Sequence, residues 1–354
     1  MYNGQAVRTV RRGVGRRGLS SGAVGLVIAA VALMLTACSG GGSDPATNGQ
    51  VTIAIQVAAP PSAPVYLADS LGYFKKQGLD VKISIVANNS LQLATGQLHY
   101  GIVGTTQMIQ AAEKGTGLQE ICPTVTTPNY VLAVSQSVLD KNHITTSTSL
   151  TDTLAALDGE KVAEIGGATN PGSVLLGQLL TKNGLAANSI KVISQTSTAS
   201  STASFANGQV GVVFQPQPAP DLVLSKVPGR IVFQTQGSSI FSALEGAPWA
   251  GIVGPTSFLS KNADLNKKIC TAVAQANNYL LDNPAASAQK LQSVMSAFSA
   301  KQLEDGLAAY PFVRNATMST TDFNNGVKEL SDFGLVKAPD ASVLSKTYTT
   351  AAQG

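Results

Sequence analysis

The chain has 354 residues, of which 44% are hydrophobic, and a formal net charge of +4, which is typical of a globular protein. The positive charge comes from the N-terminus, because five of the 24 lysines and arginines lie within the first 17 residues, where there is no acid. The remainder is close to neutral, with 20 acidic residues, and has no run of Lys and Arg. This excludes a nucleic-acid-binding protein.

The N-terminal segment has the pattern of an export signal. Its arginines are followed by an apolar stretch from Ala23 to Ala37 that is too short to span a bilayer. The end of this stretch, Leu35-Thr36-Ala37-Cys38, resembles the bacterial lipobox. The resemblance implies that residues 1–37 are a signal peptide and that Cys38 carries a lipid anchor on the extracytoplasmic face of the cell membrane. The alternative is an ordinary thiol beside a conventional cleavage site, and the Sec and twin-arginine export routes both stay open.

Residues 38–50 are rich in Gly and Ser and are predicted to be a flexible tether. From Val51 onward, short β-rich runs alternate with helical patterns, which predicts an α/β fold. The Ser/Thr-rich run from Gln195 to Ser204 is interpreted as a surface loop, and the sequence after Trp249 is mainly helical. The chain after cleavage exceeds the roughly 250–300 residues at which a single core stops growing, so we expect two lobes.

Two cysteines remain after Cys38, namely Cys122 and Cys270. In an oxidising compartment an even pair favours a disulfide. The alternative is a pair of buried apolar thiols, because the sequence alone does not show that their Cα atoms lie within reach of each other.

The sequence lacks the common signatures of catalysis. There is no nucleophile elbow, no P-loop and no dinucleotide-binding glycine motif. The two histidines, His99 and His143, have no metal-ligand spacing to another His or Cys. We therefore expect a protein that is not an enzyme and that uses no metal or cofactor.

Small polar residues instead follow three predicted strands, directly before helix N-termini. In α/β sheets this edge binds ligands, and free N–H groups at helix N-termini hold anionic or polar groups. Plain helix capping is the alternative for each turn. The candidate ligand-binding residues in these turns are Ser62, Thr105, Thr106, Gln107, Thr169 and Asn170.

Three aromatic residues, Tyr130, Phe214 and Trp249, lie near the predicted crossings between the lobes. Aromatic rings at such positions are suited to stacking on a ligand enclosed between two lobes. Core packing is the competing interpretation.

Several segments resemble the solute-binding proteins of ABC importers of the nitrate, sulfonate, taurine and thiamine-pyrimidine type. They are Gly72-Tyr73-Phe74, Gly78-Leu79-Asp80-Val81, the glycine-led run from Gly96 to Gly104, and Asn207-Gly208-Gln209-Val210 with Gln215-Pro216. The resemblance implies a two-lobed periplasmic-binding-protein-like fold of type 2, with a ligand cleft between the lobes and Gln215 among the binding residues.

The same resemblance implies lobes that are discontinuous in sequence. Lobe 1 would comprise residues 51–130 and 250–354, and lobe 2 would comprise residues 131–249. The crossing segments are expected near Pro128 to Val134 and Gln234 to Val253, and closure would occur by hinge motion.

A receptor of this kind captures a small-molecule ligand and docks on an ABC permease with its ATPase subunit, and it is expected to be a monomer. The chain departs from the family pattern at Gly211 and Gln215, where an acid and a Glu are common, and only Arg230 and Arg314 remain as arginines after the signal. We expect a small, sulfonate-like organic anion held by amides and hydroxyls. The alternatives are a neutral heterocycle, such as a thiamine-type pyrimidine or a riboflavin-like compound, a pyrimidine-synthase-like enzyme, and a structural lipoprotein.

Overall fold

The computed structural model describes residues 50–86, 88–165 and 170–353. The signal peptide, the lipidation site Cys38, the tether up to residue 49 and the candidate ligand-binding residue Thr169 lie outside the described residues. Within the described part of the chain, no helix has both the length and the apolar character needed to cross a membrane.

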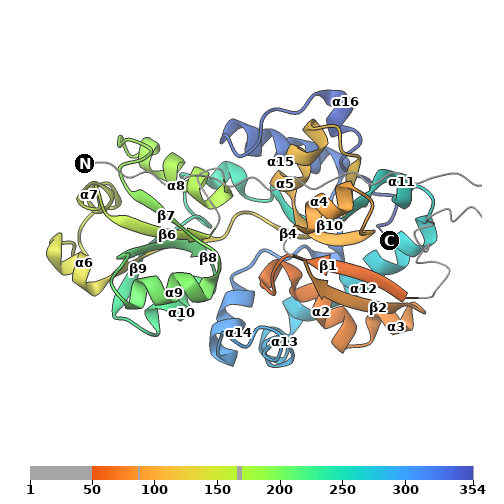
Figure 1. Ribbon diagram of the computed structural model, residues 1–354, viewed down its shortest axis with the longest axis horizontal. Helices are drawn as coiled ribbons and strands as arrows, with labels where there is room; N and C mark the ends of the chain where they lie inside the picture. Colours follow the sequence, from red (N-terminus) through yellow and green to blue (C-terminus); the bar gives the residue numbers. More distant parts are fainter. Residues whose placement is uncertain (1–49, 87, 166–169, 354) are drawn as a thin grey trace, which may run out of the picture. The chain divides into compact units, whose positions relative to one another are not determined.

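The first five-stranded sheet, with its helices, forms what we call the first lobe. Its strand order is β2-β1-β3-β10-β4, with β2 and β3 parallel to β1 and β10 antiparallel to both β3 and β4. The strands are β1 (Gln50–Ile55), β2 (Asp80–Ile85), β3 (Tyr100–Gly104), β4 (Leu118–Thr126) and β10 (Pro248–Pro255). Because β10 inserts between β3 and β4, the last third of the chain returns to the lobe in which the described chain begins (Figure 1).

Helices cover both faces of the first sheet. On one face lie α2 (Ala63–Ser70), α3 (Tyr73–Lys76) and α12 (Ala263–Asp282), and on the other lie α4 (Asn89–Ala94) and α5 (Thr105–Glu113). The stripe of α12 formed by Ile269, Val273, Ala276 and Leu280 is fully buried against the sheet, as its helical spacing indicates.

A disulfide joins the first sheet to its helical layer. Cys122 of β4 and Cys270 of α12 are bonded, with their Cα atoms 5.9 Å apart and a sequence separation of 148. Of the two alternatives that the sequence left open, the structure therefore has the bridge.

The second five-stranded sheet, with its helices, forms the second lobe. Its order is β7-β6-β8-β5-β9, with β7 and β8 parallel to β6 and β5 antiparallel to β8 and β9. The strands are β5 (Tyr130–Ser135), β6 (Lys161–Ile165), β7 (Lys191–Gln195), β8 (Val212–Pro216) and β9 (Gly229–Gln234). Helices α7 (Leu150–Ala156) and α8 (Pro171–Lys182) cover one face, and α9 (Thr198–Ala206) and α10 (Ala219–Leu224) cover the other.

The interpretation of Gln195 to Ser204 as a surface loop is wrong. Gln195 ends β7 and the helix α9 begins at Thr198. Ser197 caps this helix by accepting a hydrogen bond from Ser200 N at 3.1 Å, and Ser200 Oγ accepts one from Ser197 N at 3.2 Å. The serines that suggested a loop therefore form a capping box, and Phe205 anchors the helix in the core.

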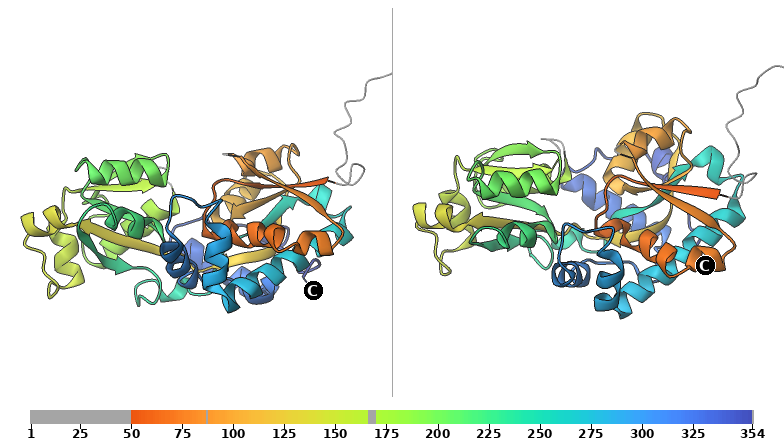
Figure 2. Two further views of the ribbon diagram at one scale, coloured as in Figure 1. Left: turned by 90° about the horizontal axis from the view of Figure 1, so that it is seen from below. Right: turned by 60° about the horizontal axis from the view of Figure 1, so that its bottom comes forward.

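The remaining elements are short or belong to the C-terminal region. They are α6 (Gln136–Lys141), α11 (Thr256–Leu259), α13 (Pro284–Leu291), α14 (Ala300–Ala308), α15 (Thr320–Asp332), α16 (Ala341–Leu344), and the 3-10 turns η1 (Pro60–Ser62), η2 (Ser242–Leu244) and η3 (Arg314–Ala316). Helices α13 and α14, in blue, lie beside α2 and share its core cluster (Figures 1 and 2).

The chain passes between the two sheets at residues 127–129 and again at residues 235–247. The two crossings are bonded to each other. Thr127 N donates to Ala247 O at 2.9 Å, and Gly246 N donates to Thr127 Oγ1 at 2.8 Å. Thr127 adopts a positive φ of 57°, a conformation that is uncommon for a β-branched residue. Both crossings are therefore held in a defined geometry beside Tyr130 and Trp249.

Candidate functional site

Tyr130, Phe214 and Trp249, which we call the aromatic cluster, come together where the crossings meet the sheets. The ring centroids of Tyr130 and Phe214 are 5.4 Å apart, and those of Tyr130 and Trp249 are 6.3 Å apart in an edge-to-face arrangement. Tyr130 begins β5 after the first crossing, and Trp249 lies in β10 after the second. Tyr130 and Phe214 are buried, whereas Trp249 is only half-buried. The cluster thus joins rings from both lobes.

A buried carboxyl group lies against this cluster. Glu164, near the end of β6, is 2% exposed and accepts a hydrogen bond from Ser173 Oγ at 3.2 Å. A Cβ atom added to Gly172 would lie 2.4 Å from Glu164 Oε1 and 2.6 Å from Tyr130 Cε1. Glycine is therefore required at the start of α8 because the carboxyl group and the ring occupy the space that a side chain would need.

Burial determines the protonation of this group. Desolvation raises the pKa of Glu164 to about 8, although the hydrogen bond from Ser173 lowers it. The pKa of Tyr130 is raised by burial first, and then by the neighbouring Glu164 and Tyr310. At neutral pH the carboxyl group is therefore largely protonated, so it can donate a hydrogen bond or lose its proton to a suitable ligand.

Sequence patterns did not single out Glu164. The available signal was an acid in the otherwise apolar strand pattern Val162-Ala163-Glu164-Ile165, because acids are seldom fully buried without a partner.

The hydroxyl groups of two of the predicted turn residues form hydrogen bonds within the protein. Ser62 Oγ donates to Ala59 O at 2.7 Å and accepts from Ala59 N at 3.2 Å. Thr105 Oγ1 donates to Glu120 Oε2 at 3.3 Å. For Ser62 and Thr105 the geometry thus corresponds to capping and packing within the first lobe.

The next residues after Thr105 differ in their exposure. Thr106 is buried, and Gln107 is exposed. A Cβ atom added to Gly104 would lie 3.8 Å from Gln107 Oε1 and 3.7 Å from Trp249 O. The side-chain oxygen of Gln107 and the backbone oxygen of Trp249 thus both lie beside Gly104.

The side chain of Asn170 bonds to the end of β6 and does not cap α8. Its Nδ2 donates to Ile165 O, and its side chain makes no capping bond to the first turn of α8. This bond joins the two described ends that flank residues 166–169, next to Glu164.

Gln215 turns away from the aromatic cluster. It is 1% exposed, and its Nε2 donates to Ser201 Oγ of α9 at 2.6 Å. Successive residues of a strand point to opposite faces, so Phe214 faces Tyr130 while Gln215 faces α9. Gln215 therefore acts mainly inside the second lobe.

The segment that follows α14 in the C-terminal region lies beside Tyr130 of the aromatic cluster. Asn129 Nδ2 donates to Ala309 O at 3.2 Å, and the Tyr310 that follows is buried and close enough to raise the pKa of Tyr130. The segment after Tyr310 pairs with β4, because Thr126 N donates to Pro311 O at 3.0 Å. Tyr310 is thereby held at the first crossing.

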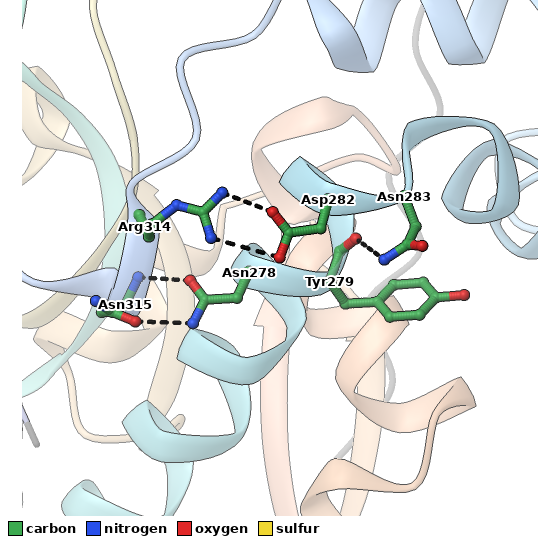
Figure 3. Close-up of polar contacts among 6 residues, drawn as sticks. All are labelled: Asn278, Tyr279, Asp282, Asn283, Arg314 and Asn315. Carbon is green, nitrogen blue, oxygen red and sulfur yellow. Dashed lines mark hydrogen bonds and ion pairs between the residues drawn. The ribbon is translucent and has the colours of Figure 1, made fainter.

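A polar clamp fixes this returning segment to α12 (Figure 3). Arg314 Nη2 contacts Asp282 Oδ1 at 2.7 Å. Asn278 Nδ2 donates to Asn315 Oδ1 at 2.7 Å, and Asn315 N donates to Asn278 Oδ1 at 2.8 Å. At the C-terminal end of α12, Asn283 Nδ2 donates a hydrogen bond to Tyr279 O at 3.1 Å.

The clamp also accounts for one of the two arginines that follow the signal. Arg314 is paired with Asp282 (Figure 3), and Arg230 Nη2 donates to Thr145 O. The contacts of both guanidinium groups thus lie outside the aromatic cluster, whereas the carboxyl group of Glu164 borders it.

The described residues also form two hollows elsewhere. One of about 440 Å³ is lined by Ser135, Lys141, Lys161 and Val210 among others, and one of about 430 Å³ is lined by Leu79, Lys261 and Leu265 among others. Neither includes a member of the aromatic cluster. Within the described ranges, no three His, Cys, Asp or Glu residues are grouped as a metal site would need.

The chain belongs to the NMT1/THI5-like family, whose model matches residues 59–287. Among curated protein sequences, none matches. The family match runs from just before η1 into the first turn of α13 and thus includes every residue of the aromatic cluster.

Solved structures share the fold. The alkanesulfonate-binding protein SsuA from Xanthomonas axonopodis pv. citri, bound to MOPS, is 17% identical, with a TM-score of 0.62 over 85% of this chain and 98% of that one. The periplasmic nitrate-binding protein NrtA from Synechocystis PCC 6803 is 14% identical, with a TM-score of 0.67 over 86% and 87%. A conserved Candida albicans gene product with the generic periplasmic binding protein fold is 14% identical, with a TM-score of 0.62 over 85% and 96%. The predicted two-lobed fold is confirmed.

Proposed function

We propose that this protein is the extracytoplasmic receptor of an ABC importer, which binds a small solute between its lobes and delivers it to a membrane permease with its ATPase subunit. The observation that carries the proposal is the aromatic cluster, which combines rings from both lobes at the two crossings. Nitrate- and alkanesulfonate-binding proteins of the same fold support it, as does membership of the NMT1/THI5-like family. Its role is binding and release of the solute, without catalysis.

The preferred ligand is a planar heterocycle that carries no negative charge. Aromatic walls favour a flat ring by stacking, and the acid Glu164 borders the cluster in place of an arginine. The expected sulfonate-like anion lacks an arginine partner in this arrangement, because Arg230 and Arg314 make their contacts elsewhere. A riboflavin-like compound or a thiamine-type pyrimidine fits the aromatic walls better.

The lipid anchor at Cys38 and the monomeric state remain part of the proposal. A Cys38→Ser variant should lose incorporation of labelled fatty acid and leave the membrane fraction. Retention of both properties by the variant would contradict the anchor without affecting the solute-binding site.

Thermal unfolding of the processed protein in detergent tests the receptor role. A ligand at 100 times its dissociation constant adds about 2.7 kcal/mol of stability. The panel comprises riboflavin, thiamine-type pyrimidines, alkanesulfonates, taurine, nitrate and aromatic carboxylates. We expect a stabilising solute from the heterocycles, and a panel without any stabilising solute would contradict the receptor role.

Variants then locate the site. Trp249→Ala should weaken binding of the stabilising solute by about 1 to 3 kcal/mol, because a stacking face is lost. Tyr279→Ala, which removes another half-buried ring on α12, serves as the matched control. Equal affinities in both variants would place the ligand away from the aromatic cluster.

A further inference from the structure

Glu164 lies at the edge of the second sheet where α/β proteins bind ligands. It is the penultimate residue of β6, which runs parallel to β7 and β8. The carboxyl ends of parallel strands form the usual ligand-binding edge. The side chain is 2% exposed, so whatever meets it must come from within the protein or from an enclosed ligand.

The carboxyl group faces the aromatic cluster. Glu164 Oε1 and Tyr130 Cε1 lie 2.4 Å and 2.6 Å from the same point, the place where a Cβ atom on Gly172 would be. The two atoms are therefore no farther apart than the sum of these distances. Ser173 Oγ donates to the other carboxyl oxygen, Oε2, at 3.2 Å.

The charges around Glu164 are those of an acid without an ionic partner. Among the described residues, Ser173 lowers the pKa of Glu164 by its hydrogen bond, and no Lys or Arg contributes to the shift. The first turn of α8, which contains Gly172 and Ser173, would attract an anionic ligand, but the carboxyl group of Glu164 already lies there. An anionic ligand would therefore meet a carboxyl group in this place, whereas a hydrogen-bond donor would meet an acceptor oxygen.

We propose that Glu164 determines the specificity of this site, by selecting aromatic solutes that present a hydrogen-bond donor, such as an amino group or an amidine, over anionic solutes of similar size. The inference rests on the proposed receptor function and names the ligand chemistry of the same site. Ser173 is a positioning residue, because it holds Oε2 and leaves Oε1 on the side of Tyr130.

Glu120 is a second buried acid among the described residues, and burial alone does not make it a ligand-binding residue. Burial also raises its pKa to about 8, and Thr105 Oγ1 donates to it at 3.3 Å. Its Oε1 lies against Gly251, and its backbone pairs with Tyr348. Its contacts with these residues lie within the first lobe, so it offers a matched control.

The test compares two ring-matched pairs of probes, benzamidine with benzenesulfonate and 4-aminopyrimidine with pyrimidine. Affinities are measured by titration calorimetry with the processed protein in detergent. We expect the wild type to prefer the donor-bearing member of each pair by tenfold or more. Glu164→Gln should reduce the preference for benzamidine at least tenfold, Glu164→Met should abolish both preferences, and Glu120→Gln should retain them.

The number of protons released on ligand binding distinguishes a direct contact of Glu164 with the ligand from a purely structural role. Among the described residues, Tyr130 is the titratable group beside Glu164 and Tyr310 neighbours Tyr130, and burial raises the pKa of both tyrosines far above neutrality. Binding of benzamidine at pH 7 should therefore release up to one proton from Glu164. Calorimetry in buffers of different ionisation enthalpy should show this release in the wild type and in Glu120→Gln, but not in Glu164→Gln.

The failure of this inference is distinguishable from the failure of the receptor role. If the wild type prefers benzenesulfonate, or if Glu164→Gln leaves both preferences unchanged, the inference is overturned and the receptor function stands. If the wild type binds none of these probes and none of the solutes in the wider panel, both are overturned.

Discussion

Thr235 and Tyr130 are joined by two hydrogen bonds across the two crossings. Thr235 N donates to Tyr130 O at 2.9 Å, and Tyr130 N donates to Thr235 Oγ1 at 2.9 Å. The same hydroxyl group donates to Pro128 O at 2.7 Å. The chain that leaves the second sheet is thereby tied to the chain that enters it, at the residue that begins the aromatic cluster.

Thr235→Val should loosen this junction. The change keeps the shape of the side chain but leaves Tyr130 N and Pro128 O without this partner, at a cost of about 1 to 3 kcal/mol in the free energy of unfolding. Urea unfolding measures it, and Thr271→Val, which removes an exposed hydroxyl group from α12, should change stability much less. Equal losses in the two variants would show that the junction carries no special stabilisation.

Two glycines of the same helix should respond differently to alanine. Gly172→Ala forces a Cβ atom into Glu164 and Tyr130, and such overpacking costs about 1 to 3 kcal/mol. At Gly177 the added atom would meet Ala187 at 3.6 Å, so Gly177→Ala should stabilise α8 by up to about 1 kcal/mol. Chemical unfolding and solute titration of both variants test this. If Gly172→Ala leaves the free energy of unfolding unchanged, the cluster has room for the added methyl group.

Opening the disulfide should destabilise the first lobe. The bridge closes a long loop between β4 and α12, and loss of a native disulfide typically costs about 2 to 5 kcal/mol. Thermal unfolding of the Cys122→Ala/Cys270→Ala double variant measures the loss, and a reducing agent should lower the stability of the wild type but not that of the variant. An unchanged midpoint in the double variant would contradict a stabilising role.

Stability should fall as pH rises from about 5 to 8. Burial raises the folded-state pKa of both Glu120 and Glu164 to about 8, well above the ordinary value of about 4.3 for an exposed Glu. Between these values the folded protein binds more protons than the unfolded chain, so protons stabilise it and their loss destabilises it. The effect is fully present below the unfolded-state pKa and is lost as pH passes the folded-state pKa. Urea unfolding across this range should show the decline, and the Glu120→Gln/Glu164→Gln double variant should flatten it.

Several local features could be predicted because they depend on neighbours in sequence. The helix that opens at Pro171 after Asn170, with its Gly184 in a left-handed turn of φ 78°, follows from helix-end rules. The alternation of strands and helices was enough for the α/β class, and the resemblance implied the two lobes.

Which side chains meet was decided by the tertiary structure. The sequence does not tell which face of β8 lies toward Tyr130, so Phe214 and Gln215 looked equivalent, although only Phe214 faces the cluster. Ser62 and Thr105 carry ordinary ligand-binding side chains, yet their hydroxyl groups are used by Ala59 and Glu120.

The sequence by itself determined the local elements, the near-neutral charge of the chain after the N-terminal arginines, and the types of side chain available for binding. Only the tertiary structure decided that Glu164 lies beside Tyr130 and that the arginines make their contacts elsewhere. The physical reason is range. Helix caps and strand periods arise between residues a few positions apart, whereas the burial and protonation of Glu164 depend on α8 and on the first crossing, which folding brings together.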